Sequence, residues 1–394
     1  MKANVSLSPF WAGLLGAILF VPFPLRVSAD DLRPAASPSI SAALQPFVDK
    51  HSLAGAVTLV ADKDKILSLD AVGFADVAAQ KPMKTDALFW IASQSKSITA
   101  AAFMMLVDEG KVKLDDPVEK YLPEFKDLQV AVGKGKEVVL QKPKQPITIR
   151  QILSHTSGMP FASAKERPTL DMLPLSEGVK SYAATPLQTE PGTKYAYSNA
   201  GINTAGRIIE VISGMPYEDF LDKRLFGPLA MKDTTFWPNE EQLTRLAKSY
   251  KPNKEKTGLE ELTISQLKYP LNDRKRQPMP AGGLFSTAGD VGRFCQMVLN
   301  GGTFNGKLLL SEDAVKQMTT KQTGDDLKDN YGLGWSTGGS FGHGGAFATN
   351  MSIDPKRGLI TVYMVQHAGF SGEGVKSHGA FKQAAEELFA KSKK

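Results

Sequence analysis

Apolar and polar residues repeat with different periods along this chain, and the periods predict which segments are helices and which are strands. Residues 39–51 have helical periodicity, and the apolar runs 55–61 and 65–71 that follow are typical of strands. A similar mixture returns beyond Gly282. Helices are predicted at residues 290–300 and 379–390, and strands at residues 341–352 and 359–366. Strand-forming segments therefore occur near both ends of the sequence.

The middle of the chain, from residue 93 to about Gly214, has mostly helical apolar spacing, with proline and glycine in its loops. Strands near both ends with helices between them predict an α/β protein of the α+β type. In this fold an antiparallel sheet built from both termini is flanked by helices and carries an inserted, mainly helical region. We expect a sheet domain from residues 30–92 and 278–394, a helical domain from 93–277, and an active site where they meet.

The first 29 residues have the pattern of a secretory signal peptide. Lys2 precedes an apolar stretch over residues 10–25, and the small-residue sequence Val27-Ser28-Ala29 stands before Asp30. The apolar stretch is short for a membrane span and contains two prolines. We therefore expect cleavage near Ala29, no stable membrane anchor, and a periplasmic or secreted product.

Charge and composition narrow the function classes. The chain has 394 residues and a net charge of +6, and loss of Lys2 and Arg26 with the signal peptide leaves +4. Its basic segments, residues 134–144 and 274–276, lack interleaved aromatic residues, so we expect solvated loops and no nucleic-acid partner. The five histidines have no metal-ligand spacing, and the single Cys295 is expected to be a buried helix residue. No metal or cofactor is predicted.

Ser93 and Lys96 form the most informative local pattern, because residues three apart on a helix are neighbours. A serine hydroxyl becomes a useful nucleophile only when a nearby base takes its proton. Lys96 can act as that base if it is neutral, which requires about 4 kcal/mol of destabilisation of its ammonium form. The apolar residues around the pair are candidates for this desolvation. A surface lysine beside a helix-capping serine is the alternative, and Ser265 and Lys268 repeat the same spacing.

Tyr197-Ser198-Asn199 is a second candidate for chemistry. Side chains two residues apart in an extended segment point the same way. A phenol beside a lysine can share its proton, and an asparagine amide can hold an acyl side chain of the substrate. The alternative is an aromatic residue packed on the core and an asparagine that caps a turn.

The segment from Phe341 to Ala346 is rich in glycine, which lets a substrate approach the backbone closely and lets an N–H group face a developing oxyanion. A bulge or hairpin with a structural His343 is the alternative. Two Gly-x-Ser-x-Gly sequences, at residues 334–338 and 338–342, match the nucleophile elbow of α/β-hydrolases, but no helix is predicted after either. For His155, within a run of small polar residues, we expect a loop-ordering role.

Taken in order, Ser93-x-x-Lys96, Tyr197-x-Asn199 and His343-x-Gly345 resemble the serine β-lactamase and penicillin-binding protein superfamily, particularly its class C β-lactamase and esterase branch. The resemblance extends over essentially the whole mature chain. It implies that Ser93 is the acylated nucleophile and Lys96 its base, with Tyr197 as proton shuttle or second base. It further implies a substrate-binding set and an oxyanion hole made by the amides of Ser93 and Ala346. The substrate-binding residues implied in this way are Asn199, His343, Gly345 and Ala346.

The third motif departs from the class C pattern Lys-Thr-Gly, because His343-Gly344-Gly345 stands there. A fixed positive charge that grips a substrate carboxylate is lost, since a histidine is mostly neutral at pH 7. A literal Lys256-Thr257-Gly258 precedes the Gly282-Gly283-Leu284 box, whereas the family places its third motif after that box. We therefore expect Lys256 to be a coincidental match.

The resemblance implies an exported serine hydrolase that cleaves small esters or amides through an acyl-Ser93 intermediate, with esterase activity favoured. The alternatives are a β-lactamase, or a D-Ala-D-Ala carboxypeptidase or D-aminopeptidase that acts on peptidoglycan-like substrates. A recognition protein without catalysis is a further alternative, although the chain retains Ser93, Lys96 and Tyr197.

Overall fold

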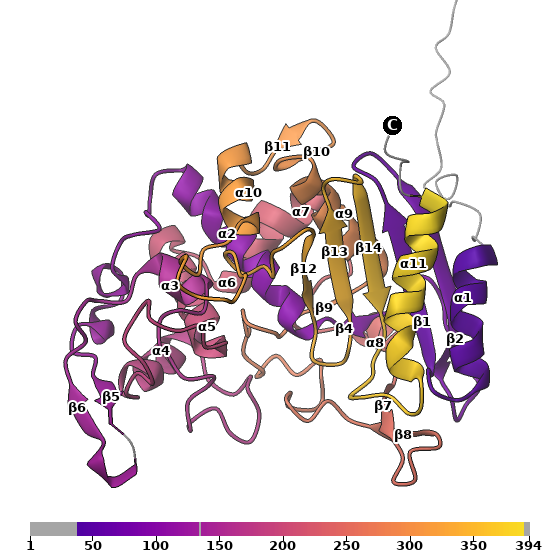
Figure 1. Cartoon of the computed structure of the whole chain (residues 1–394), viewed down its shortest axis with the longest axis horizontal. Coiled ribbons are helices and arrows are strands. Elements are labelled where there is room, and N and C mark those ends of the chain that lie inside the picture. Colours follow the sequence, from indigo (N-terminus) through magenta and orange to yellow (C-terminus); the bar gives the residue numbers. More distant parts are fainter. Residues whose placement is uncertain (1–37, 134, 390–394) are drawn as a thin grey trace, which may run out of the picture. The chain divides into compact units, whose positions relative to one another are not determined.

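A six-stranded antiparallel sheet is the centre of the computed structural model, which describes residues 38–133 and 135–389. Its strands follow the order β12, β13, β14, β1, β2, β3 across the sheet (Figure 1). Their bounds are β12 Phe341–Gly344, β13 Asn350–Asp354, β14 Leu359–Met364, β1 Gly55–Ala61, β2 Ile66–Asp76 and β3 Lys81–Pro82. Thr58 of β1 pairs with Tyr363 of β14, so the sheet is built from both ends of the chain, as predicted.

Helices cover both faces of this sheet. On one face α1 (Pro38–Asp49) and α11 (Ser377–Phe389) pack together against β1, β2 and β14. On the other face α9 (Ala288–Leu299) contacts β1, β13 and β14 (Figure 1). All seven residues of β1 are buried, which explains why its sequence is a continuous apolar run.

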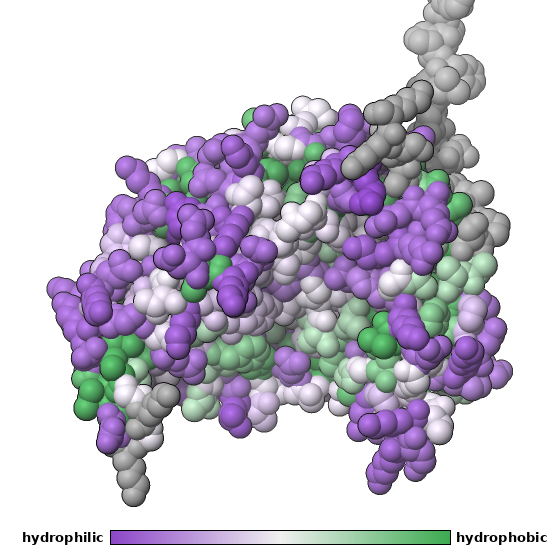
Figure 2. Space-filling view, viewed as in Figure 1, coloured by the Kyte–Doolittle hydropathy of each residue, from purple (hydrophilic) through white to green (hydrophobic). Residues whose placement is uncertain are grey.

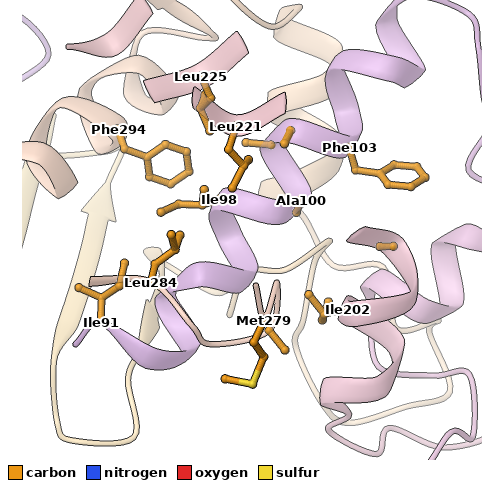
Figure 3. Close-up of a cluster of buried hydrophobic side chains, with 14 of the residues drawn as sticks. Ile91, Ile98, Ala100, Phe103, Ile202, Leu221, Leu225, Met279, Leu284 and Phe294 are labelled. Atoms are coloured by element: carbon orange, nitrogen blue, oxygen red, sulfur yellow. The ribbon is translucent and has the colours of Figure 1, made fainter. Parts of the chain in front are cut away.

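Helix α2 (Ser95–Asp108) lies in the interior, and every residue from Ser95 to Leu106 is buried. It packs against α5 (Asn199–Ser213) and α10 (Glu312–Thr319). Figure 3 shows part of this core, in which Ile98 and Ala100 of α2 lie among side chains such as Leu221 and Phe294. A helix that is buried all round gives a rigid support for the residues at its N-terminus.

The inserted region contains short helices, and two-stranded antiparallel pairs lie within it and on either side of it. The helices are α3 Ile149–Leu153, α4 Leu175–Ala183, α6 Tyr217–Leu221, α7 Gly227–Leu229 and α8 Glu240–Thr244. The paired strands are β4 Phe89–Trp90 with β9 Phe285–Ser286, β5 Val130–Val132 with β6 Val139–Gln141, β7 Ser249–Pro252 with β8 Leu259–Leu262, and β10 Thr303–Phe304 with β11 Lys307–Leu308. No helix within the described ranges is long and apolar enough to cross a membrane.

The structure corrects two sequence-based expectations. The single strand predicted over residues 341–352 is a hairpin of β12 and β13, because Gly345 N–H donates to Thr349 O at 2.7 Å and closes a turn. Residues 274–276 are not a wholly solvated loop, because Arg276 is 2% exposed and pairs with the buried Asp171. Polar side chains cover much of the face seen in Figure 2, whereas Val139 and Leu140 of β6 are exposed in a hydrophobic patch.

Cys295 is buried in α9, as expected. The predicted signal peptide lies outside the described residues. The expected division into a sheet domain and a helical domain stays a prediction.

Candidate active site

Ser93 lies at a sharp turn between strand β4 and helix α2. A short 3₁₀ turn, Ala92–Gln94, connects them and runs directly into α2. Ala92 has φ +46°, a left-handed conformation that is unfavourable for a residue with a Cβ atom. Strand β4 pairs with β9, so the strained turn is held by a strand pair before it and by helix α2 after it. This turn leaves Ser93 partly exposed while the neighbouring Gln94 and Ser95 are buried.

Lys96 is the nearest basic group to the Ser93 hydroxyl. Its Nζ lies 3.1 Å from Ser93 Oγ and donates to Ala281 O at 2.6 Å. The side chain is fully buried, and this burial holds the pKa of Lys96 well below its usual value. A buried amine of lowered pKa can take a proton from a serine hydroxyl.

Tyr197 lies against the same pair. Lys96 Nζ is 4.7 Å from the centroid of the Tyr197 ring, and Tyr197 borders the same cavity as Ser93. Burial raises the pKa of Tyr197 well above its usual value, and this effect outweighs the opposing influence of the Ser93 hydroxyl. The phenol is therefore protonated at neutral pH and can pass a proton on.

His155 orders the segment that carries Tyr197. Its Nδ1 accepts from Ser198 N–H at 3.2 Å, and its carbonyl accepts from Ala196 N–H at 2.8 Å. Its ring lies 4.4 Å from that of Tyr197, centroid to centroid. Burial holds the pKa of His155 well below its usual value, so the ring is neutral and Nδ1 is free to accept. The predicted loop-ordering role is confirmed.

Asn199 is the first residue of helix α5, rather than part of an extended segment as expected. Ser198 caps this helix, with its Oγ accepting from Gly201 N–H at 3.1 Å. Asn199 and Tyr197 nevertheless border the same cavity. The Oδ1 atom of Asn199 is buried and has no hydrogen-bond partner within the described part of the chain. It is thus an acceptor that a substrate N–H or O–H group can satisfy.

The third motif is placed beside the nucleophile by the β12–β13 turn. Ala346 borders the cavity with Ser93, whereas His343 and Gly345 are not among the residues that line it. His343 is buried, with Nε2 2.9 Å from Tyr331 Oη and Nδ1 2.7 Å from Gly344 O. Since Gly344 O can only accept, Nδ1 carries the proton and Tyr331 donates to Nε2. Burial lowers the pKa of His343 to about 3, so this ring is neutral.

The cavity at Ser93 has a volume of about 270 Å³. Much of its wall is apolar, from Trp90, Phe161, Met279 and Ala346, and Gln266 adds an amide. None of the residues that line it carries a fixed charge. Sequence reasoning missed Phe161, Met279 and Gln266, which come from loops whose shapes have no local sequence signature.

Other features lie apart from this cavity. Lys256 is in the turn between β7 and β8, and Ser265 and Lys268 are in a loop, so neither motif match supplies a nucleophile and base on a helix. A larger cavity of about 410 Å³ is lined by Ser352 and Lys382 among others and contains none of the predicted site residues. Among the described residues there is no cluster of His, Cys, Asp and Glu suited to a metal ion.

Two known proteins are similar to this chain over most of its length. The chain is 31% identical over 366 residues to protein Rv1367c of Mycobacterium tuberculosis, covering 83% of this chain and 89% of that protein. It is 28% identical over 310 residues to a Salmonella agona protein named "Putative D-alanyl-D-alanine carboxypeptidase", covering 71% and 69% of the two chains.

Among solved structures, EstCE1, described as a hydrolase with promiscuous acyltransferase activity, superimposes with a TM-score of 0.74 at 22% identity, covering 88% of this chain and 97% of EstCE1. At this identity the similarity shows a shared fold. The sequence profile of the family described as Beta-lactamase matches residues 40–385, nearly the whole described chain. The chain therefore belongs to the beta-lactamase family of serine hydrolases.

Proposed function

We propose that this protein is an esterase that cleaves small, uncharged esters through an acyl-Ser93 intermediate. The observation that carries the proposal is the 3.1 Å approach of the buried Lys96 amine to Ser93 Oγ, at the edge of an uncharged cavity. A neutral amine next to a hydroxyl is the arrangement that nucleophilic catalysis by serine requires.

The proposed reaction has two stages. Ser93 Oγ attacks the ester carbonyl carbon and gives its proton to Lys96 Nζ, while the amides of Ser93 and Ala346 stabilise the oxyanion. As the carbon–oxygen bond of the ester breaks, a proton reaches the departing alkoxide through Tyr197, which is protonated at neutral pH. Water then hydrolyses the acyl-enzyme by the reverse proton route and restores Ser93.

The preference for uncharged substrates follows from the charges around the cavity. A β-lactam or a D-alanyl-D-alanine peptide carries a carboxylate, which a buried site must pair with a cation. The lining residues hold no fixed cation, and His343 is neutral because its pKa is about 3. The similarity to a protein named as a D-alanyl-D-alanine carboxypeptidase supports that activity as the second candidate.

Parallel turnover of a short-chain nitrophenyl ester and a chromogenic cephalosporin tests the proposal, with Ser93→Ala as the control. We expect ester cleavage that disappears in Ser93→Ala, and little cleavage of the cephalosporin. Fast cephalosporin turnover by the wild-type protein would contradict the preference for uncharged esters and indicate a β-lactamase. Ester turnover equal in both proteins would contradict the acyl-Ser93 mechanism itself.

Export is part of the proposal. The sequence of residues 1–29 supports a signal peptide cleaved near Ala29. Expression of the full chain in a Gram-negative host, followed by mass measurement of the periplasmic product, should give a chain that begins at Asp30. An uncleaved chain in the cytoplasm would contradict export.

A further inference from the structure

A buried row of hydrogen bonds connects Lys96 to a carboxyl group on a distant loop. Lys96 Nζ donates to Ala281 O at 2.6 Å, and the N–H of Ala281 donates to Asn203 Oδ1 at 3.0 Å. Asn203 Nδ2 donates to Tyr182 Oη at 3.0 Å, and Tyr182 O–H donates to Glu166 Oε1 at 2.6 Å. The other carboxyl oxygen, Glu166 Oε2, accepts from Ser163 N–H at 2.8 Å.

The chemistry of the partners fixes the direction of every bond in this row. The backbone N–H of Ala281 can only donate, so Asn203 must present its oxygen there and its NH₂ group to Tyr182. Burial raises the pKa of Tyr182 well above its usual value, so its hydroxyl keeps its proton and donates to Glu166. From the Ala281 N–H to Glu166 the hydrogen bonds all point one way and strengthen one another, and a carboxyl group with both oxygens accepting is a suitable end.

The side chains of this row are withdrawn from solvent. Glu166 is 5% exposed, Tyr182 3% and Asn203 2%. They come from a loop, from α4 and from α5, and their row ends at the backbone N–H of Ala281, whose carbonyl belongs to the next peptide group. Burying a carboxyl group and an amide costs free energy unless they are hydrogen-bonded, so a buried polar row of this kind holds its members in one arrangement.

We propose that Asn203 is a positioning residue for catalysis, which holds the Ala281 carbonyl where it orients Lys96 toward Ser93, and that Tyr182 and Glu166 hold Asn203 in turn. This inference rests on the proposed function, because it assigns Lys96 as the base. None of these three side chains lines the cavity. Their effect on the reaction is therefore exerted through the backbone of Ala281, whose N–H donates to Asn203 and whose carbonyl accepts from Lys96.

The Ala281 carbonyl also influences the proton affinity of Lys96. A carbonyl that accepts from the amine favours its charged form, so a carbonyl that moves away lowers the pKa of Lys96 further. The titratable groups that face Lys96 are Tyr197, His155 and His343, and all three are neutral near pH 7. If the acidic limb of the kcat/KM profile shifts in an Asn203 variant, the shift therefore indicates that the Ala281 carbonyl has moved relative to Lys96.

The test compares two neighbouring substitutions on helix α5 in the full chain. Asn203→Leu keeps the size of the side chain and removes both of its hydrogen bonds. Thr204→Val is the matched control, because Thr204 is equally buried and its hydroxyl donates only within the helix, to Ala200 O at 2.8 Å. Tyr182→Phe is the second variant, which leaves Asn203 in contact with Ala281 and removes the partner behind it.

For Asn203→Leu we expect kcat for the nitrophenyl ester to fall about tenfold or more, with KM within about twofold of wild type. The acidic limb of kcat/KM should move to lower pH, whereas Thr204→Val should match wild type in both measures. Tyr182→Phe should also lower kcat and move the acidic limb of kcat/KM to lower pH, with smaller changes than in Asn203→Leu. If Asn203→Leu does not fold, the test rests on Tyr182→Phe.

An Asn203→Leu profile identical to that of Thr204→Val would overturn the inference, and so would a fall in kcat with an unmoved acidic limb, which indicates a merely structural role. Failure of the proposed function is recognised separately, because the wild-type protein would then show no ester turnover that depends on Ser93.

Discussion

At Gly345 the β12–β13 turn lies against the backbone of Ile91, two residues before the nucleophile. A Cβ atom at this position would lie 2.1 Å from Thr349 Oγ1 and 2.6 Å from Ile91 O. We expect Gly345→Ala to push the turn away from Ser93, lowering kcat/KM for the ester by about 100-fold and stability by about 1–3 kcal/mol. Steady-state kinetics and urea unfolding measure both effects.

Gly344 provides the control for this prediction. A Cβ atom there would meet nothing nearer than 3.7 Å, and its φ does not lie in the left-handed region. Gly344→Ala should therefore retain activity within about threefold. Equal losses in the two variants would show that the close approach of Gly345 to Ile91 is not what matters.

Tyr197 is expected to act through its hydroxyl rather than its ring. In Tyr197→Phe the ring contact with His155, at 4.4 Å between centroids, is retained, so the loop should keep its shape. We expect kcat to fall by about 10²–10⁴ with little change in KM, because one proton-transfer group is lost. Tyr195→Phe, whose ring also contacts His155, is the control and should keep near wild-type kcat. A Tyr197→Phe kcat within threefold of wild type would rule out the proton relay.

The proximity of Ser93 and Lys96 was predictable, because helical geometry dictates how far apart residues i and i+3 lie. The partner of Lys96 on its other side was not, because Ala281 contributes a backbone carbonyl 185 residues away. Every residue has such a carbonyl, so no side chain identifies the one that is used.

At the scale of elements, a buried ion pair joins two loops that contribute to the cavity. Arg276 Nε lies 2.7 Å from Asp171 Oδ2, with the two side chains 2% and 0% exposed. Leu170, beside Asp171, donates its N–H to the carbonyl of Gln266, a residue of the cavity wall, at 2.9 Å. The ion pair thus connects the stability of both loops to the shape of the site.

We expect Arg276→Met to lower the free energy of unfolding by about 3–5 kcal/mol, because it leaves the Asp171 carboxylate buried without its partner. Since Gln266 would lose support, KM for the ester should rise as well. Arg274→Met is the control, since the exposed Arg274 lies over the Trp237 ring at 4.8 Å and contributes about 0.5–1 kcal/mol. Denaturant titration of both variants measures these losses of unfolding free energy. A loss below 1 kcal/mol in Arg276→Met would contradict the prediction.

Element boundaries were predictable where one apolar pattern continues, as in β1 and α11. The stretch over residues 341–352 was predicted as one strand because its apolar residues continue through the turn. The hairpin depends instead on the Gly345 to Thr349 hydrogen bond and on Ala348 at φ +65°, which local propensity does not reveal.

At the scale of the whole molecule, three buried histidines and the half-buried His378 should make stability sensitive to mild acid. Burial lowers the pKa of His343 to about 3, of His367 and His378 to about 4, and of His155 well below its usual value. In the unfolded chain these rings take up protons below about pH 6.5, whereas the folded protein keeps them neutral. Their contribution to stability is therefore complete above pH 6.5 and is lost as the pH falls toward 4.

Urea unfolding at pH 7, 6.5 and 5 measures this effect. We expect the free energy of unfolding to fall between pH 6.5 and 5 by at most about 2 kcal/mol per histidine, in a range above the titration of most carboxyl groups. His378→Phe should retain the ring packing on Tyr363 and reduce the pH dependence. A free energy of unfolding that is constant over this range would contradict the prediction.

The sequence by itself determined the fold class, the presence of strands at both ends, and the close spacing of Ser93 and Lys96, because these depend on local periodicity and on the geometry of one helical turn. Only the tertiary structure decided that His343 is engaged by Tyr331 and Gly344, that Arg276 is buried, and that Asn203 reaches the Ala281 peptide. The physical reason is that burial and hydrogen-bond partners are set by segments far apart in the chain. The sequence around a polar residue can be the same whether its side chain lies in solvent or in the core.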